Sequence, residues 1–517
     1  MNRRSFVTGS IGAGLSALGT VVSQGEVGAV ESTTPIAPKA SGPRPNVVII
    51  LADDLGLGDL SCYGATKVQT PIIDKFASQG IQFSDAHAAT AVCCPSRYSV
   101  LTGRYCWRTA LKDDCIFGHD TLLIEEDRMT IGSMLQSAGY KTACIGKWHL
   151  GFGRDYPDWN GELKPGPLEV GFDHYFGIPV TNAQKPDVYI ENHRVVNLDP
   201  KDPIRLGADS KTNKMTGGTA ARYNPEELCM TETAKAVKYI ETTDKSSPFF
   251  LYFTPSNVHA PFTPHPRFHG KSGCGLYGDF IMEFDWCVGE ILSALDRAGV
   301  ADNTLVILSS DNGAPYERVS WDRGLRANLD YLGQKTDIWE GGHRVPFIAR
   351  WPGKIPANTQ SNELICLIDL IASIADIIKF PLPHDAAPDS VSVLPALLGR
   401  QGGEKPVREG ALILASYEGM LAVREGPWMC ILGVGSGGTM TDYSRHHEGF
   451  SLEETGMTTT GWARQGCMAD PKLPRGQLYN LETDHRESKN VYEDHPEIVE
   501  RLTNILIEYR AHGRSRT

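Results

Sequence analysis

Several common features are missing from this sequence of 517 residues. It has no repeat period and no low-complexity block, and with 41% hydrophobic and 22% charged residues its composition is that of an ordinary globular protein. It has no excess of basic residues: the net charge is −12, which argues against a nucleic-acid partner. An anionic substrate would therefore have to be met by a local basic pocket, because the overall field gives no help. The cysteines include no CxxC pair with zinc spacing.

The first 29 residues predict an export signal. Arg3 and Arg4 lie in a charged n-region, residues 7–22 are weakly apolar, and residues 27–29 offer a small-residue cleavage site. The arginine pair resembles a bacterial twin-arginine signal, which predicts a periplasmic or secreted protein. An uncleaved anchor is the alternative, but the segment is Gly-rich and poorly hydrophobic for a stable membrane span. We therefore expect no stable membrane insertion.

Residues 30–44 are rich in Pro, Ser, Thr and Ala and predict a linker. The cysteine count is twelve, and an even count in an exported protein permits disulfides. No particular bridge can be assigned from the spacing. If one cysteine is modified or reactive, eleven remain, and at least one of these cannot form a disulfide with another.

Residues 45–400 predict an α/β domain with a large, mostly parallel sheet sandwiched by helices. The run 46–52 is short, apolar and β-branched, which is typical of a buried parallel strand, and strands alternate with helices after it. Strands are expected at 46–52, 81–89, 140–145, 248–253, 304–309 and 345–350, and helices at 70–80, 129–138, 277–298 and 364–378. Residues 154–224 and 317–332 have weak periodicity and are expected to form loops that select the substrate.

Residues 401–517 differ from the preceding region in their pattern of short strands and turns, which predicts a small α+β domain. Short strands at 410–415, 421–424, 428–432 and 477–480 indicate an antiparallel sheet, followed by an amphipathic helix at 496–511. The long Gly/Thr-rich insertion 433–476 predicts a flexible loop.

The stretch 92–103 combines a cysteine, a proline, an arginine and a closing Thr-Gly. Pro95 suits the first turn of a helix over 96–101 that stops at Gly103. Cys93 would then lie beside unpaired backbone N–H groups and the positive end of the helix dipole, which favours an anion. Arg97 adds a fixed charge one turn along. The alternative is an ordinary buried cysteine beside a helix cap.

Polar groups collect just past the predicted strands. Asp53 and Asp54 follow the first strand, at the end of the sheet where α/β proteins bind ligands. The simpler interpretation is a solvated turn. Two neighbouring carboxylates repel each other, however, unless a cation lies between them. The complete set of candidates is Asp53, Asp54, Cys93, Lys147, His149, His259, Asp311, Asn312 and Lys335. Three carboxylates and an amide oxygen suit Ca²⁺ or Mg²⁺ better than zinc. The lysines, the histidines and Arg97 supply local positive charge in a chain whose net charge is negative.

These motifs resemble the signatures of the type I sulfatases of the alkaline phosphatase superfamily. Cys93-Cys94-Pro95-Ser96-Arg97 with Thr102-Gly103 resembles the first signature, and Gly146-Lys147-Trp148-His149-Leu150-Gly151 the second. Other segments match in the family's order, and the part around 268–292 is most similar to arylsulfatase A-like members. These segments are 53–54, 259–262, 311–313, 340–346 and 478–482. The resemblance runs from about residue 45 to the C-terminus.

The resemblance implies a sulfate-ester hydrolase in which Cys93 is converted to Cα-formylglycine by a formylglycine-generating enzyme. It implies a divalent ion, Ca²⁺ or possibly Mg²⁺, held by Asp53, Asp54, Asp311 and Asn312 together with the modified residue 93. It further implies that Arg97 orients the nucleophile, Lys147 and Lys335 bind sulfate, His259 protonates the leaving oxygen and His149 assists the nucleophile. One departure is Cys94, where Ser, Thr or Ala is more usual.

Two other functions remain open from the sequence. A phosphodiesterase or phosphonate monoester hydrolase could use the same formylglycine, and a protein that binds sulfated glycans without catalysis could keep the fold. Every expected position is filled, which disfavours the second. The substrate is expected to be a sulfated small molecule or saccharide, with polysaccharide fragments favoured by analogy with exported bacterial sulfatases. The loops expected to select the substrate contain no motif that indicates which substrate it is.

Overall fold

The computed structural model describes residues 44–112, 114–207, 214–400, 402–403, 405–438 and 475–516. The predicted export signal, the linker up to residue 43 and most of the 433–476 insertion lie outside the described residues. No helix in the described ranges is both long and apolar enough to cross a membrane.

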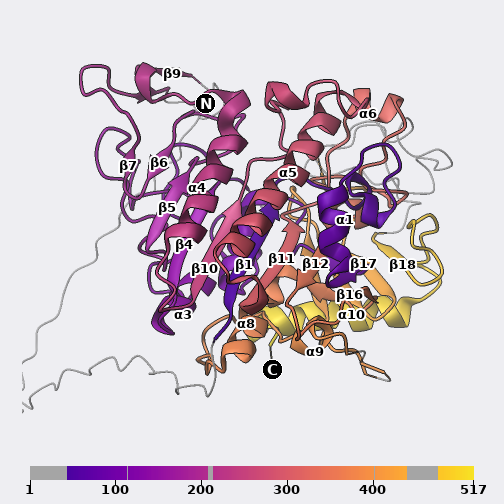
Figure 1. The fold of residues 1–517 in the computed structure, drawn as a ribbon. Coiled ribbons are helices and arrows are strands. Elements are labelled where there is room, and N and C mark those ends of the chain that lie inside the picture. The colour runs from indigo at the N-terminus through magenta and orange to yellow at the C-terminus, as the bar shows by residue number, and fades with distance from the viewer. Residues whose placement is uncertain are drawn as a thin grey trace, which may run out of the picture. The chain divides into compact units, whose positions relative to one another are not determined.

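A ten-stranded mixed sheet forms the centre of the fold (Figure 1). Its strands lie in the order β13 (Thr359–Ser361), β2 (Ile81–Phe83), β12 (Phe347–Arg350), β11 (Thr304–Ser310), β1 (Asn46–Ala52), β10 (Phe249–Thr254), β4 (Lys141–Gly146), β5 (His174–Gly177), β6 (Ile190–Glu191) and β7 (Arg194–Val195). The five strands from β11 to β5 are parallel, whereas β12 is antiparallel to both of its neighbours. The strand β1 is buried along its whole length, as its apolar, β-branched sequence predicts.

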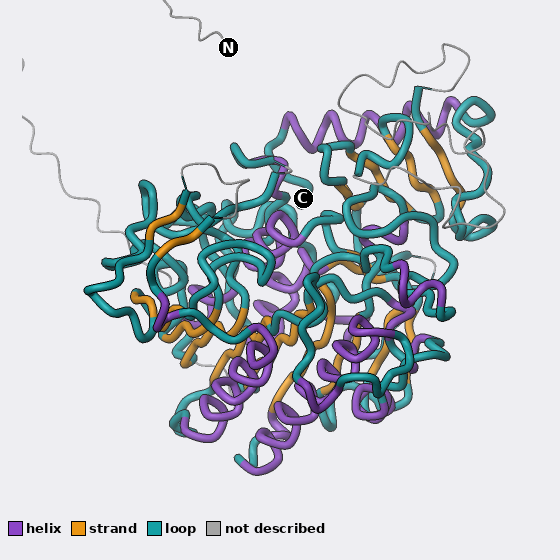
Figure 2. Tube along the Cα trace, turned by 90° about the horizontal axis from the view of Figure 1, so that it is seen from above, coloured by secondary structure: helices purple, strands orange, loops and turns teal. Residues whose placement is uncertain are grey.

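Helices cover both faces of this sheet (Figure 2). Successive side chains of β1 point to opposite faces: Val48 and Ile50 belong to one apolar cluster, and Val47 and Ile49 to another. The first cluster includes side chains of α1 (Pro71–Ser78), α4 (Leu228–Thr242) and α5 (Gly275–Arg297). The second includes side chains of α2 (Cys93–Thr102), α3 (Ile131–Ser137) and α8 (Leu370–Ile378). The shorter helices are α6 (Arg318–Asp322), α7 (Glu340–His343) and α9 (Leu394–Leu397).

A separate antiparallel sheet follows in the chain, as the sequence predicts. It has the order β15 (Leu412–Ala415), β16 (Leu421–Glu425), β17 (Trp428–Ile431) and β18 (Gln477–Asn480) and is covered by α10 (Pro496–Ala511). It is joined to the segment before α2, because Ala91 N donates to Ala415 O at 2.9 Å. The boundary between domains 45–400 and 401–517 stays a prediction.

Some predicted elements differ from the structure. The expected strand 81–89 is two strands, β2 and β3 (Ala86–His87), because Ser84 and Asp85 break it, and β3 pairs with β14 (Ile365–Cys366) away from the large sheet. The segment 364–378 is predicted as one helix, but it begins with the short strand β14, and its α-helical part is α8 alone.

The region 154–224, which the sequence predicts to be loops, contributes three strands to the edge of the large sheet, β5 to β7. It also contains the hairpin β8 (Arg205–Leu206) and β9 (Met215–Thr216). These strands are two to four residues long, which is too short to give a clear alternation in sequence.

Candidate active site

The candidate residues meet at one edge of the large sheet. Asp53 follows β1, Lys147 follows β4 and Asp311 follows β11, and these neighbouring parallel strands all end on the same side. All three side chains are 0% exposed. The backbone at Gly146 makes this approach possible, since a Cβ there would lie 2.1 Å from Thr254 O.

Cys93 is the first residue of α2 and is 3% exposed. The helix runs longer than expected, from Cys93 to Thr102, with Pro95 as its third residue. Gly103 ends it with a φ of 62°, as predicted. The Cys93 Sγ atom lies 3.3 Å from His149 Nδ1. The N-terminus of a buried helix thus points residue 93 into the cluster, where backbone N–H groups favour an anion.

Buried cations pair with the three carboxylates. Lys147 Nζ lies 2.8 and 2.7 Å from the two oxygens of Asp53. Arg97 Nε and Nη2 lie 2.9 and 2.7 Å from Asp311 Oδ2, and Nη2 lies 3.5 Å from Asp53. Lys335 Nζ lies 2.6 Å from Asp54 Oδ2. The basic pocket that the net charge of −12 requires is therefore built from three side chains at this edge.

Burial and these charges shift the pKa values of the acids in opposite directions. Burial alone would raise the pKa of Asp53, but Lys147 and the other nearby cations hold it well below its usual range. Burial raises the pKa of Asp311 above its usual range despite the attraction of Arg97. A hydrogen bond from Cys115 and the charge of Lys147 lower the pKa of the Cys93 thiol against the effect of burial. The pocket thus favours negative charge at residue 93.

Two groups of donor atoms could hold a cation here. Ligand atoms of Asp53, Cys93 and Asp311 lie within 4.8 Å of one another, and so do those of Asp53, Asp54 and His259. Asn312 donates from Nδ2 to Asp54 Oδ1 at 2.8 Å, whereas its buried Oδ1 has no hydrogen-bond partner. An unpaired buried amide oxygen beside three carboxylates is a donor set that fits a hard divalent ion.

The two histidines are held differently. His149 Nε2 lies 3.0 Å from Ile116 O, which can only accept, so Nε2 carries the proton and Nδ1 faces Cys93 as an acceptor. His149 also has a φ of 58°, and such left-handed backbone outside glycine is concentrated at functional sites. Burial lowers its pKa, which favours the neutral ring.

His259 lies at the accessible side of the cluster, with a side chain 12% exposed. Its Nδ1 is 3.0 Å from Asn182 Oδ1, and its Nε2 is 3.7 Å from Asp54 Oδ2. The neighbouring Lys335 side chain is 17% exposed. A substrate would therefore reach the buried groups past His259 and Lys335.

The structure brings together every candidate from the sequence and adds two residues that the sequence did not single out. Asn182 orients His259 and donates to the carbonyls of His259 and Pro261, each at 3.1 Å. Cys115 lies near Cys93 and lowers the pKa of its thiol. Both lie in irregular segments where no motif marks them, so only their spatial position could reveal them.

Comparison with known proteins identifies relatives of this chain. Residues 45–379 match the family model described as Sulfatase. An N-acetylgalactosamine-6-O-sulfatase of Bacteroides thetaiotaomicron is 38% identical over 90% of this chain and 92% of its own. The N-acetylgalactosamine-6-sulfatase of Canis lupus familiaris is 32% identical over 71% of this chain and 69% of its own.

Solved structures share the architecture. One, described under the metabolism of multiple glycosaminoglycans by Bacteroides thetaiotaomicron, has a TM-score of 0.80 at 36% identity and covers 91% of this chain and 100% of the other. The predicted fold class is thereby confirmed, and the two rival functions are not favoured. The chain belongs to the sulfatase family, as a type I sulfatase with the alkaline phosphatase-like fold, and is a sulfuric ester hydrolase.

Proposed function

We propose that this enzyme removes 6-O-sulfate groups from N-acetylgalactosamine in sulfated saccharides. The observation that carries the reaction is the convergence of three carboxylates, an unpaired amide oxygen and the cations Arg97, Lys147 and Lys335 around residue 93. The sugar and the position of the sulfate rest on the names of the two N-acetylgalactosamine-6-sulfatase relatives.

Cys93 would act after conversion to Cα-formylglycine by a formylglycine-generating enzyme. The surroundings fit such a group, since His149 Nδ1 lies 3.3 Å from the Cys93 sulfur and offers an acceptor for a hydroxyl proton. When hydrated, the aldehyde supplies two hydroxyl groups on one carbon, so that one can attack sulfur and the other can release sulfate afterwards. If the signal is a twin-arginine signal, the chain is exported folded, and this conversion is completed in the cytoplasm.

Asp53, Asp54, Asp311 and Asn312 would hold a divalent ion, for which we propose Ca²⁺, with residue 93 completing the group. The oxygen donor set favours Ca²⁺ or Mg²⁺ over softer metals. Such an ion supplies polarisation of the sulfate ester and lowers the pKa of a coordinated hydroxyl.

The positions of the remaining residues suggest a separate catalytic role for each. Arg97 already spans Asp311 and Asp53, so it would orient residue 93 and offset its charge. Lys147 and Lys335 would bind sulfate oxygens and stabilise the charge that grows in the transition state. His259, at the accessible side, would donate a proton from Nε2 to the departing sugar oxygen.

The test combines kinetics with mass spectrometry on protein made in a bacterium that carries a formylglycine-generating enzyme. We expect desulfation of N-acetylgalactosamine-6-sulfate to be much faster than that of the 4-sulfate, and an aryl sulfate to be hydrolysed faster than an aryl phosphonate. Preference for the 4-sulfate would overturn the positional assignment, and preference for the phosphonate would overturn the reaction. An unmodified Cys93 peptide in active protein would overturn the nucleophile.

We also propose that the enzyme is exported. The support is the arginine pair and the small-residue site within residues 1–29. Fractionation of the native host would locate the protein, and replacement of Arg3 and Arg4 by Lys should retain it in the cytoplasm. Unchanged export of that variant would contradict a twin-arginine route.

A further inference from the structure

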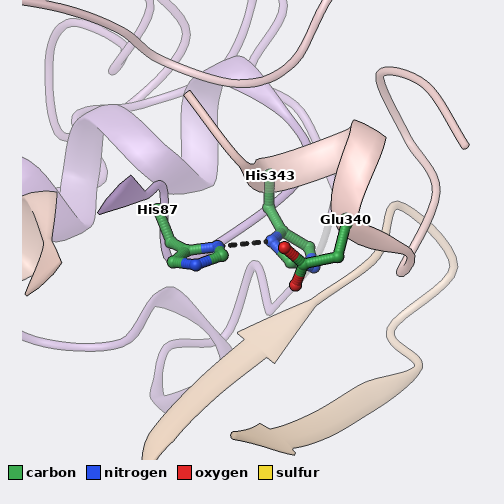
Figure 3. A group of neighbouring side chains, drawn as sticks. All are labelled: His87, Glu340 and His343. Atoms are coloured by element: carbon green, nitrogen blue, oxygen red, sulfur yellow. Dashed lines mark hydrogen bonds between the residues drawn. The ribbon is translucent and has the colours of Figure 1, made fainter. Parts of the chain in front are cut away.

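A second cluster of metal-ligating side chains lies apart from the residues assigned above. His87, Glu340 and His343 are each 0% exposed, and their ligand atoms lie within 4.8 Å of one another. His87 ends β3, and the other two lie on α7. Figure 3 shows the two rings meeting through one nitrogen each, with the Glu340 carboxylate beside the His343 ring.

The outer nitrogens of both rings are already engaged as donors. His343 Nε2 lies 2.9 Å from Ile338 O, and a carbonyl oxygen can only accept. His87 Nε2 lies 2.7 Å from Asp85 Oδ1. Asp85 is ion-paired with Arg344 at 2.8 Å and Arg424 at 3.2 Å, so it is an ionised acceptor. Both Nε2 atoms therefore carry protons.

This arrangement turns two lone pairs toward each other. The Nδ1 atoms of His87 and His343 lie 3.0 Å apart, and in neutral rings with protonated Nε2 neither Nδ1 has a hydrogen to donate. A cation must therefore lie between them or beside them. It could be a proton, which would make one ring an imidazolium, or it could be a metal ion.

Glu340 bears on the choice between these two cations. Its Oε2 accepts from Arg344 Nε at 2.5 Å, but its buried Oε1 has no hydrogen-bond partner. One proton shared by the rings does not reach this oxygen, which then depends on the buried Glu487, whose pKa is raised by burial and by the neighbouring Glu340. A metal ion bound by both Nδ1 atoms and a Glu340 carboxylate oxygen would occupy both lone pairs, and ligand atoms of the three residues lie within 4.8 Å of one another.

We propose that His87, His343 and Glu340 form a zinc site. Two nitrogens and a carboxylate oxygen are typical zinc ligands, in contrast to the all-oxygen set of the active site. Tetrahedral zinc about 2.05 Å from each nitrogen would place them about 3.3 Å apart, only slightly farther than they now lie. The contacts from Nε2 to Asp85 and to Ile338 O are the outer hydrogen bonds that orient metal-bound histidines. Three protein ligands leave one tetrahedral position for water.

The site lies directly behind the segments that carry active-site residues. Ala88 N, on the segment leading to Cys93, donates to His343 O at 2.8 Å. Gly313 N, next to Asn312, donates to Gly342 O at 2.9 Å. Zinc would tie β3 to α7 and so fix both segments, and its role would be structural because its ligands are fully buried.

Metal analysis of the full-length protein, purified in Ca²⁺ buffer, tests the proposal. We expect about one zinc per chain by inductively coupled plasma mass spectrometry, reduced at least about fivefold in His343→Gln. The control is Asp311→Asn, which alters the active-site donor set and should keep its zinc. Protein produced with Co²⁺ in place of zinc should show the visible absorption of tetrahedral cobalt, a measurement on the wild-type chain that needs no variant to fold.

Wild-type protein without zinc and without the cobalt absorption would overturn the proposal. The cation between the rings would then be a proton, visible as an imidazolium in the nitrogen NMR shifts of His87 or His343. Equal zinc loss in Asp311→Asn and His343→Gln would also overturn it, because the metal would then belong to the active site. None of these results depends on sulfatase activity, so failure here is distinguishable from failure of the proposed function.

Discussion

Replacing His259 by Ala should separate sugar sulfates from activated aryl sulfates. A general acid contributes about 10²–10⁴-fold when the leaving oxygen needs a proton. A sugar hydroxyl is a poor leaving group and needs it fully, so kcat on N-acetylgalactosamine-6-sulfate should fall by about that factor, or about 2.7–5.4 kcal/mol in barrier. A nitrophenyl sulfate leaves as a stable anion, so its kcat should fall by less than about tenfold.

The structure predicts a moderate loss of stability in this variant. The His259 side chain is 12% exposed, and its ring contacts Asn182 at 3.0 Å and the more distant Asp54 at 3.7 Å. Deletion of this mostly buried ring should change the free energy of unfolding by about 0.5–3 kcal/mol. Thermal melting would measure this loss of stability. It would also show whether the variant is folded under the conditions of the kinetic assay.

Asn182→Ala is the matched control for positioning. It leaves the ring in place but removes one of the two oxygens that Nδ1 contacts, the other being Ala260 O. The kcat on the sugar sulfate should therefore fall less than in His259→Ala, with the same dependence on leaving group. Steady-state kinetics of both variants on both substrates would test this. Equal losses on the sugar sulfate and the aryl sulfate in His259→Ala would refute the general-acid assignment, because the residue would then act on binding or on the nucleophile.

Three further outcomes are expected. Cys93→Ala should abolish turnover while far-UV circular dichroism stays unchanged, and residual sulfatase activity would exclude residue 93 as the nucleophile. Gly103→Ala should destabilise the fold by about 2–4 kcal/mol in urea unfolding, because φ is 62° and a Cβ would lie 2.5 Å from Ile371 Cγ2. Gly299→Ala has a similar φ of 66° but open space, so it should cost only about 1–2 kcal/mol, and equal losses would contradict the packing argument. Burial raises the pKa of Glu283 to about 8. The folded state therefore keeps a proton that the unfolded state loses above pH of about 4.5, and stability falls between there and pH 8. In Glu283→Gln this fall should be smaller in urea titrations, and an unchanged slope would show that Glu283 is ionised in the folded protein.

Several elements could be predicted because their own residues determine them. The helix α10 begins and ends where the amphipathic pattern predicts, and β1 lies where an apolar, β-branched run predicts a buried strand. The helix stop at Gly103 follows from the need for a left-handed φ. The family signatures likewise contain most of the candidate active-site residues, whereas Lys335, Asn182 and Cys115 lie outside them.

Other features could not be predicted locally. The strands β5 to β7 are two to four residues long and form only because β4 offers a paired edge. Asn182 joins the active site through a contact with a residue 77 positions away. His87 and His343 are 256 positions apart, and each alone is an unremarkable residue beside a turn or strand.

The sequence by itself determined the fold class, the family and the residues at the strand ends, because periodicity, helix signals and short motifs are local properties of the chain. Only the tertiary structure decided which of these groups are buried together, which donor atoms remain unpaired and which face each other. Burial removes water as a hydrogen-bond partner, so the protonation and ligand-binding capacity of a buried group depend on the few atoms packed against it. Those atoms come from distant parts of the chain, as the pairs Asp53–Lys147 and His87–His343 show.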